Sequence, residues 1–452
     1  MSAAPQPVKL QRVLSLWGLL LYGIIVIQPT APLGSFGVVA SVAQGHVATA
    51  ILIAMLAMVL TAISYGRMSN VHPNAGSAYA YVSRELNPHL GFVTGWSIAM
   101  DYLLNPTIGT IWCSKAAMNL APLPYPVYVV FFAILFTWLN MRGLKATTRM
   151  NLFLTLGMGV VLVAFFITAA GYLMREAGVA GLLSTQPFYD PQTFSWALVS
   201  TGTSIAVLTY MGFDSISTLS EEVENPRRNI PLATVLLCVI TGVLGCLEVY
   251  VGQLIWPDFR TFPDMDTAYV SAAGRAGGPW MFHTMNLTLL VATMGSSLGA
   301  QLGSVRLLYA MGRDGALPKR FFGYLDPQRR VPVYNLYLTG VVIAVGALTI
   351  SYQSGAELLN FGAFIAFMGV NLSAMAHGYF RSQDRSLRSI VVNLLPPLLG
   401  FLICFYIWWS LRTPAKLLGC GWLILGGIYY WWLTGGFKRT VTFAETETER
   451  GI

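Results

Sequence analysis

Three carboxylic acids, Asp101, Asp214 and Glu248, lie within long apolar stretches of this chain. An ionised side chain is costly in such surroundings, so each of these acids is a candidate for a functional site. A carboxylate in an apolar cavity can bind the ammonium group of a ligand, or it can take up and release a proton. The three acids therefore indicate recognition of a cation, transfer of a proton, or both.

The two aspartates are the candidates for ligand binding. Asp214 directly follows Gly212-Phe213, and its alternative role is to cap a helix that begins there. Asp101 is followed by Tyr102, whose ring and hydroxyl suit an amine. A structural partner on a neighbouring segment is the alternative explanation for Asp101. Both aspartates and Tyr102 are predicted to contact a bound substrate.

Four residues are candidates for coupling to an ion. Asp214 and Glu248 are predicted proton carriers. Ser296 and Ser297 offer hydroxyl oxygens, which are ligands that a sodium ion accepts. Small hydroxyl residues also form hydrogen bonds between packed membrane helices, and this is the alternative for the serine pair.

The elements that must position these residues are membrane spans. The chain has 452 residues, of which 55% are hydrophobic and 10% charged, with a mean hydropathy of +0.61. A soluble domain carries about 25% charged residues. Stretches long enough to cross a hydrocarbon core of about 30 Å recur along the whole chain. Twelve spans are predicted in one all-α membrane domain over 1–452, at 15–43, 47–66, 88–117, 125–142, 150–173, 195–220, 232–256, 279–312, 332–350, 356–379, 391–410 and 417–436.

Two of the predicted spans are interrupted. The first contains Gln28-Pro29-Thr30-Ala31-Pro32-Leu33-Gly34-Ser35-Phe36-Gly37, and the sixth contains Tyr210-Met211-Gly212-Phe213-Asp214. Proline removes backbone donors, and glycine tolerates unusual dihedral angles. Breaks that lie five spans apart indicate two inverted five-helix repeats, about 15–173 and 195–379, with a binding site between them. Simple kinks, which are common in membrane helices, are the alternative.

The breaks supply the rest of the predicted site. Half-helix amino termini offer N–H groups to an anion, and unwound carbonyls accept hydrogen bonds from an ammonium group. Aromatic residues at the second break suit a gate over the ligand, or they pack between helices. Besides the aspartates and Tyr102, the predicted substrate-binding residues are Gln28, Thr30, Ala31, Pro32, Gly34, Ser35, Tyr210, Gly212 and Phe213.

The basic residues indicate how the spans are oriented. With the amino terminus in the cytoplasm, 21 of the 27 lysines and arginines fall on the cytoplasmic side and 6 on the other. This asymmetry follows the positive-inside rule and predicts that both termini are cytoplasmic. The net charge of +8 is thereby explained by orientation in a lipid bilayer, so no nucleic-acid partner is expected. No removable signal peptide is predicted.

Other classes of function lack their usual motifs. The sequence has no clustered His or Cys ligands, no Gly-x-Ser-x-Gly and no Gly-Lys-Ser/Thr phosphate loop, so neither an enzyme nor a metal or cofactor site is expected. It has no repeated filter or ring of charges typical of a channel. The five cysteines are odd in number and lie in or beside apolar runs, which is typical of small reduced hydrophobic residues.

Several motifs resemble the amino acid–polyamine–organocation transporters. The most specific are Gly212-Phe213-Asp214 and the following segment Glu221-Glu222-Val223-Glu224-Asn225-Pro226-Arg227-Arg228-Asn229-Ile230-Pro231. Further matches are 73–79, Gly95-Trp96 and 306–315. Within the superfamily, the stretches 61–66, 87–89 and 360–363 look most like bacterial putrescine importers.

This resemblance implies a leucine-transporter-type fold of ten spans in two inverted repeats, with two additional helices at about 391–436. It implies a secondary active transporter of the bacterial cytoplasmic membrane that imports a small amine or amino acid by alternating access, with the substrate at the breaks of spans one and six. A proton is the expected coupling ion. Some members carry a lysine in the fifth span in place of sodium, but 151–164 contains no lysine or arginine, so sodium stays open.

The substrate stays open at this stage. Putrescine importers of this type carry an aspartate in the first break where this chain has Gly34, whereas amino acid members carry a Gly-Ser-Gly-like turn that receives the substrate carboxylate. Gly34-Ser35-Phe36-Gly37 reproduces that turn in part. An amino acid/amine exchanger and a sensor built on a transporter fold are the alternative functions.

Overall fold

The computed structural model describes residues 14–72, 77–142, 148–219, 223–313, 315, 317–327, 329, 331–382, 384–436 and 438. These residues form helices and their connections, and the one β-type contact among them is an isolated bridge between Leu14 and Val223. The structure is therefore all-helical, as the sequence predicts. Of the quoted family motifs, 73–76, Glu221, Glu222 and Asp314 lie outside the described residues.

The helices coincide with the predicted apolar segments and add a few short elements. In the first part of the chain they are α1 (Leu16–Ile27), α2 (Ala31–Val42), α3 (Val47–Val71), α4 (Ser77–Glu85), α5 (Pro88–Met118), α6 (Tyr125–Met141) and α7 (Thr148–Ala177). The second part begins with η1 (Val179–Leu182), α8 (Trp196–Ala206), η2 (Val207–Tyr210), η3 (Phe213–Leu219), α9 (Pro226–Ile255), η4 (Phe259–Thr261) and α10 (Ala268–Arg313). It ends with α11 (Lys319–Phe322), α12 (Val333–Thr349), α13 (Tyr352–Met375), η5 (Ala376–Phe380), α14 (Leu387–Ser389), η6 (Ile390–Leu394), α15 (Leu395–Trp409) and α16 (Thr413–Leu433).

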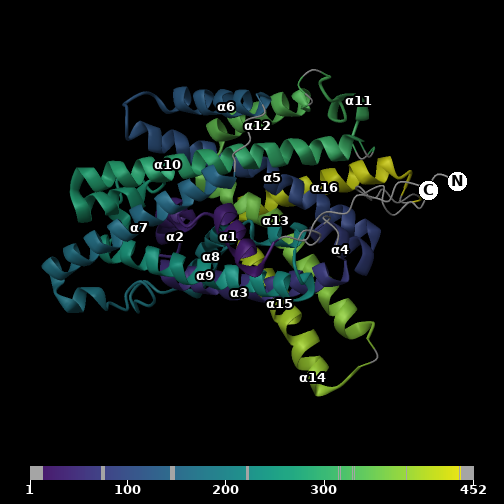
Figure 1. The fold of residues 1–452 in the computed structure, drawn as a ribbon, viewed down its shortest axis with the longest axis horizontal. Coiled ribbons are helices and arrows are strands. Elements are labelled where there is room, and N and C mark those ends of the chain that lie inside the picture. The colour runs from purple at the N-terminus through teal and green to yellow at the C-terminus, as the bar shows by residue number, and fades with distance from the viewer. Residues whose placement is uncertain are drawn as a thin grey trace.

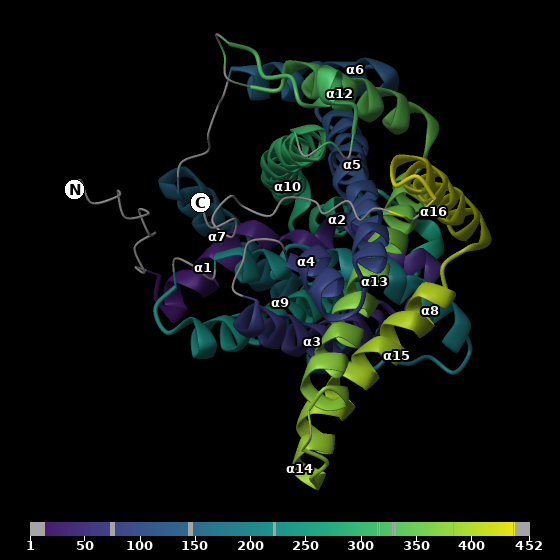
Figure 2. The same ribbon diagram turned by 90° about the vertical axis from the view of Figure 1, so that its right-hand side faces the viewer.

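The long helices run side by side through a single bundle. Both views place α5 and α10 in the middle, the α6–α12 pair on one side, and α3 and α15 on the other (Figures 1 and 2). The end of α13 and the start of α15 form an arm that projects away from the bundle and carries α14 at its tip.

Five described helical segments are long and apolar enough to cross a membrane: Val47–Val71, Leu152–Ala177, Pro226–Ile255, Tyr352–Phe380 and Leu387–Trp409. A sixth span results when α1 and α2 are taken as one bent span. The segments differ in position, because 72% of the apolar window of Tyr352–Phe380 is buried and only 22% of that of Leu152–Ala177. The first is therefore central in the bundle, and the second presents most of its apolar side chains outward, as a lipid-facing helix does.

The first predicted interruption is present but shorter than expected. The axis bends by 49° between α1 and α2, and Gln28, at the end of α1, has the left-handed φ of 70°. The prediction extended the break to Gly37, whereas helix resumes at Ala31. Proline in the first turn of a helix lacks only an N–H that has no intrahelical partner there, so Pro32 starts α2 instead of breaking it.

The second predicted interruption separates η2 from η3 at Met211–Gly212. Gly212 has φ 106°, a value that glycine adopts without strain. A β-carbon at this position would lie 2.8 Å from Cγ1 of Val26, one residue before the end of α1. The backbone of the second break therefore packs directly against the end of the first half-helix, so the two interruptions lie together.

Candidate functional site

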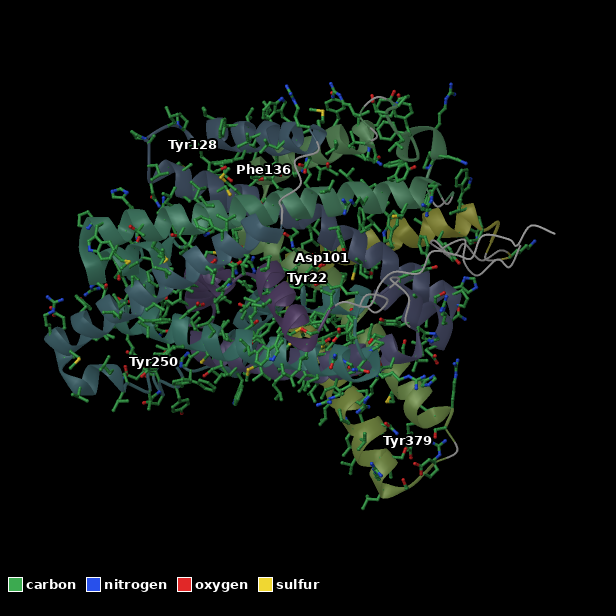
Figure 3. All side chains as sticks on the ribbon, viewed as in Figure 1. Tyr22, Asp101, Tyr128, Phe136, Tyr250 and Tyr379 are labelled. Carbon is green, nitrogen blue, oxygen red and sulfur yellow. The ribbon has the colours of Figure 1, made fainter. Side chains whose placement is uncertain are left out.

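The candidate site lies where the two interruptions meet α5. Figure 3 places Tyr22 of α1 and Asp101 of α5 in the middle of the molecule. Tyr22 is within electrostatic range of Tyr102, the residue after Asp101. The predicted pair Asp101-Tyr102 is therefore next to the first half-helix.

Asp214 occupies the first turn of η3, immediately after the second break. The backbone amides of Asp214 and Ser215 are directed at its carboxylate. The hydroxyls of Ser215 and Ser217 donate to the carbonyls of Gly212 and Asp214, both at 2.6 Å, and fix this turn. Asp214 thus does cap the second half-helix, which was the alternative to a functional role. Capping uses amide donors and leaves the negative charge without a counterion.

The structure brings the two aspartates into one electrostatic environment. Asp214 lies within electrostatic range of Asp101 on α5 and of Tyr65, Tyr81 and Tyr102. Both aspartates are partly buried. Neither forms an ion pair with any residue in the described part of the chain. The site therefore carries two carboxylates that lack a protein cation.

Aromatic rings surround this acidic region. The ring of Tyr65 lies 5.4 Å from that of Phe213, 6.2 Å from that of Tyr81 and 6.3 Å from that of Phe367, measured between centroids. Phe213 is fully buried in this cluster. The Tyr81 hydroxyl is buried beside Ser217 of η3. Carboxylates beside electron-rich ring faces are a suitable environment for an organic cation.

Tyr210 has a different environment from its neighbour Phe213. Its hydroxyl donates to the carbonyl of Ile51 on α3 at 2.9 Å, and the side chain is buried. Tyr210 therefore fastens η2 to α3. Of the two aromatic residues predicted to close over a ligand, only Phe213 lies in the cluster around Asp214.

Two predicted residues of the first break hold it to its surroundings. Gln28 donates through Nε2 to the carbonyl of Ala292 on α10 at 2.9 Å, which ties the break to that helix. Thr30 is buried at the start of α2, and its side chain makes no cap hydrogen bond there.

The other predicted residues of that segment lie in the first turns of α2. Ala31 and Pro32 begin the helix, and Ser35 donates to the carbonyl of Pro32 at 3.2 Å. Gly34 faces α5, where a β-carbon would lie 3.5 Å from Nε1 of Trp112. That indole N–H is buried and has no partner within the described structure. No described contact joins Gly34 or Ser35 to the aspartates.

Glu248 lies in a separate buried region of α9. It is fully buried, and neither carboxyl oxygen has a hydrogen-bond partner in the residues that the structure describes. One turn earlier, Gly245 contacts Pro32 of α2 and Thr209 of η2. The hydroxyl of Thr209 is likewise buried and unpaired there. Glu248 is therefore a buried acid close to α2, the second half of the first span, and to the second break.

The two serines of α10 face different surroundings. Ser297 is buried against Gly109 of α5, and its hydroxyl has no partner among the described residues. Ser296 is exposed. The pair does not converge on one point, although the neighbouring carbonyl of Ala292 contacts the first break through Gln28.

Sequence reasoning missed the residues that complete the aromatic environment. Tyr22, Tyr65, Tyr81 and Phe367 come from α1, α3, α4 and α13, and none stands beside a predicted acid in the sequence. Tyr65 and Tyr81 lie in or next to segments that carry the family resemblance, which is the one signal that pointed to them.

Comparison with known proteins identifies the class. The amino acid permease family matches residues 21–424, and the chain belongs to this family, within the amino acid–polyamine–organocation superfamily. It is 34% identical over 443 residues to the low-affinity putrescine importer PlaP of Escherichia coli (strain K12), covering 96% of both chains. It is 27% identical to the methylthioribose transporter of Bacillus subtilis (strain 168), covering 95% of both chains. It is 26% identical to the branched-chain amino acid permease BcaP of Lactococcus lactis subsp. cremoris (strain MG1363), covering 84% of this chain and 85% of the permease. The protein is thus a multi-pass membrane protein of a transporter family, as the motifs indicate.

Proposed function

We propose that this chain is a secondary active transporter that imports a small organic amine, with putrescine as the reference substrate. The observation that carries the proposal is the pair Asp101 and Asp214, which share a site lined by tyrosines and have no described protein cation. A diamine with an ammonium group at each end would neutralise both carboxylates. Similarity to a putrescine importer supports the same substrate class.

The proposed transport cycle is alternating access through ten spans in two inverted repeats, about 15–173 and 195–379, with two additional helices at about 391–436. The two interrupted spans meet at Val26 and Gly212. A change of the helix angle at one break would therefore displace the backbone at the other. The proposed orientation places both termini in the cytoplasm of a bacterial cell, in accordance with the 21 to 6 division of basic residues.

Proton coupling is the proposed source of energy. Asp214 belongs to the substrate site, and Glu248 is buried beside α2 and η2, the elements that adjoin the two breaks. A proton exchanged by either acid would be linked to movement of these elements. Sodium is the competing ion, with the unpaired hydroxyl of Ser297 as its proposed ligand.

Amino acid import is a second candidate function. The observation that favours it is the unpaired indole N–H of Trp112 beside Gly34, a buried donor that a substrate carboxylate would satisfy. The permease BcaP is a relative with an amino acid substrate. Putrescine has no carboxylate, so the two candidates differ in whether this donor is used.

Uptake into proteoliposomes tests the proposal. Labelled putrescine and a panel of labelled amino acids would be supplied with and without an inward proton gradient, with sodium varied separately. We expect putrescine uptake that requires the proton gradient and is lost in Asp214→Asn. Asp384→Asn, in an exposed connection, is the matched control and should transport normally. Uptake of amino acids without putrescine would overturn the amine proposal.

A further inference from the structure

A buried histidine connects three elements on the side of the bundle where α2 turns into α3. His46 precedes α3 and is fully buried. Its Nδ1 lies 2.8 Å from the carbonyl oxygen of Ala43, and its Nε2 lies 3.1 Å from the backbone nitrogen of Asp190. Asp190 belongs to the connection 178–195 between α7 and α8, so this ring links the α2–α3 turn to a segment 144 residues away in sequence.

These two contacts fix the protonation state of the ring. The carbonyl of Ala43 has no proton, so Nδ1 must donate to it. The backbone nitrogen of Asp190 is a donor, so Nε2 must accept from it. A neutral imidazole with its proton on Nδ1 satisfies both bonds, whereas an imidazolium carries a proton on each nitrogen and cannot accept.

Protonation of His46 would therefore place two N–H groups against one another in a buried site. The hydrogen bond to Asp190 would be lost, and a charge would be left among apolar neighbours. Those neighbours include Phe194, whose ring meets the imidazole edge to face with centroids 5.1 Å apart. The segment around Asp190 has to move away for the new N–H to reach water.

The rest of the connection is held independently of His46. Thr49 donates to the carbonyl of Phe188 at 2.6 Å. Tyr250 of α9 donates to the carbonyls of Leu182 and Ser184 at 2.9 and 3.0 Å. The connection therefore has one anchor on α9 at its start and a second anchor on the α2–α3 turn, and only the second contains a side chain of the type that gains a proton between about pH 5 and pH 8.

The charged groups near His46 do not replace the lost bond. On the connection, the carboxylate of Asp190 accepts from the amide of Gln192 at 2.9 Å, and Tyr189 packs on Phe194. On α9, the neutral Gln253 donates to the carbonyl of Gly45.

The other elements around the turn contribute little charge. On η4, Asp258 caps the amide of Arg260, whose guanidinium lies over the ring of Phe259, and that ring faces Gly45. α8 and α3 meet the turn through Gly202 and Thr49, which carry no charge. No described acid forms an ion pair with His46.

We propose that His46 is a proton-sensitive latch. While the ring is neutral, it holds segment 188–194 on the α2–α3 turn, and when the ring is protonated it releases that segment. Histidine is the side chain that ordinarily changes charge between about pH 5 and pH 8. The latch joins α2, which follows the first break, to the connection that leads into α8, which precedes the second. In the proposed orientation it faces outside the cell, so external acid frees the outer ends of both interrupted spans.

Hydrogen exchange of the full-length protein in phospholipid nanodiscs tests this proposal without any substrate. Exchange of peptides would be followed by mass spectrometry at about pH 5 and about pH 7.5, with times scaled for the intrinsic pH dependence of exchange. We expect the protection factors of the amides in segment 188–194 to be about tenfold lower at the lower pH. Segment 182–184, held by Tyr250, serves as the internal control and should not change.

Two variants separate the latch from general loosening. His46→Gln keeps an acceptor near the position of Nε2 and cannot be protonated, so its protection should be equal at both pH values. Thr49→Val removes the neighbouring bond and should lower protection at both, while keeping the dependence on pH. The proposal is overturned if the wild type shows no pH effect on 188–194, or if His46→Gln keeps the effect. Because exchange is read without transport, these outcomes are independent of the proposed substrate and coupling ion.

Discussion

Two groups of buried acids in this protein differ in what neutralises them. Glu85, which is 4% exposed, accepts from Nη1 of Arg381 at 2.7 Å and from Nε2 of His72 at 2.6 Å. Glu357 is fully buried and accepts from Nε of Arg412 at 2.6 Å. These acids lie near the ends of the bundle helices, and the protein supplies their cations. They hold α4 to η5 and the α15–α16 connection to α13.

The acids near the helix interruptions are different. Asp101 and Asp214 lie close enough to repel one another, and no described residue forms an ion pair with either. A buried charge without a partner is strongly unfavourable, so such an acid takes up a proton or something else supplies the opposite charge. We propose that the missing cation is the substrate. Acids paired within the protein should matter for stability, and the unpaired acids should matter for binding.

The largest effect is expected from Asp214→Asn. Removing one partner of a desolvated charge pair costs several kcal/mol, so putrescine affinity should fall by about 100-fold or more. Binding to the purified protein, measured by calorimetry, gives this value directly. Asp384→Asn should leave the affinity unchanged. Equal affinity of Asp214→Asn and the wild type would remove Asp214 from the site.

Asp101→Asn should have a smaller effect that depends on the ligand. Asp101 is proposed to bind the second ammonium group of putrescine. The variant should therefore bind putrescine with about tenfold lower affinity, whereas its affinity for n-butylamine, which has one amine, should fall much less. A competition assay with both ligands on the same preparation measures the difference. An equal loss for both ligands would show that Asp101 does not distinguish the second amine.

A paired acid should give the opposite pattern. Glu85→Gln weakens the contacts with Arg381 and His72, and we expect the midpoint of thermal unfolding to fall by about 3 °C with putrescine affinity unchanged. Arg381 is 56% exposed, which limits the loss because solvent already screens the pair. Fluorescence-detected unfolding gives the midpoint. If Glu85→Gln instead bound putrescine much more weakly and unfolded at the normal temperature, the two groups of acids would not differ in the proposed way.

The smallest effect is expected at Asp266, in the connection before α10. Burial, together with the neighbouring Asp264 carboxylate, raises the pKa of Asp266 to about 6. The folded protein then holds a proton that the unfolded chain releases near pH 4, so stability is lost as the pH rises through about 4 to 6. Over this pH range we expect the midpoint of thermal unfolding to fall by about 1 °C. Asp266→Asn should remove this dependence on pH. Lys115 keeps its 2.9 Å contact with Asp264 in that variant. An unchanged pH profile in the variant would contradict the assignment.

The sequence predicted the positions of the two interruptions better than the length of the first one. Two prolines and several glycines between Gln28 and Gly37 mark a break, but sequence alone does not show on which side of a proline the helix resumes. In the structure α2 begins at Ala31, so Gly34 and Ser35 lie within a helix, and Gly34 faces Trp112. The second break was predicted from Gly212 and the acid Asp214 within an apolar run, and in the structure Gly212 has a positive φ.

The acidic residues of the candidate site could be predicted from the sequence, but the aromatic residues around them could not. An acid in an apolar stretch is conspicuous, so Asp101 and Asp214 were found from composition alone. Tyrosines and phenylalanines occur on lipid-facing and buried surfaces alike, and their role depends on packing between distant helices. Tyr65 and Tyr81 meet Asp214, and Tyr22 meets Tyr102, only through tertiary structure. The short helix α4, which carries Tyr81 and ends at Glu85, was not predicted because it is not a span.

We propose that a substrate cation neutralises the acids that the protein leaves unpaired. This proposal is tested most directly by calorimetric titration of the wild-type protein with putrescine, n-butylamine and butane-1,4-diol, which share a four-carbon chain and differ in charge. We expect putrescine to bind most tightly and n-butylamine to bind at least about tenfold more weakly. The diol should show no binding. Binding of the diol with an affinity close to that of putrescine would contradict the proposal.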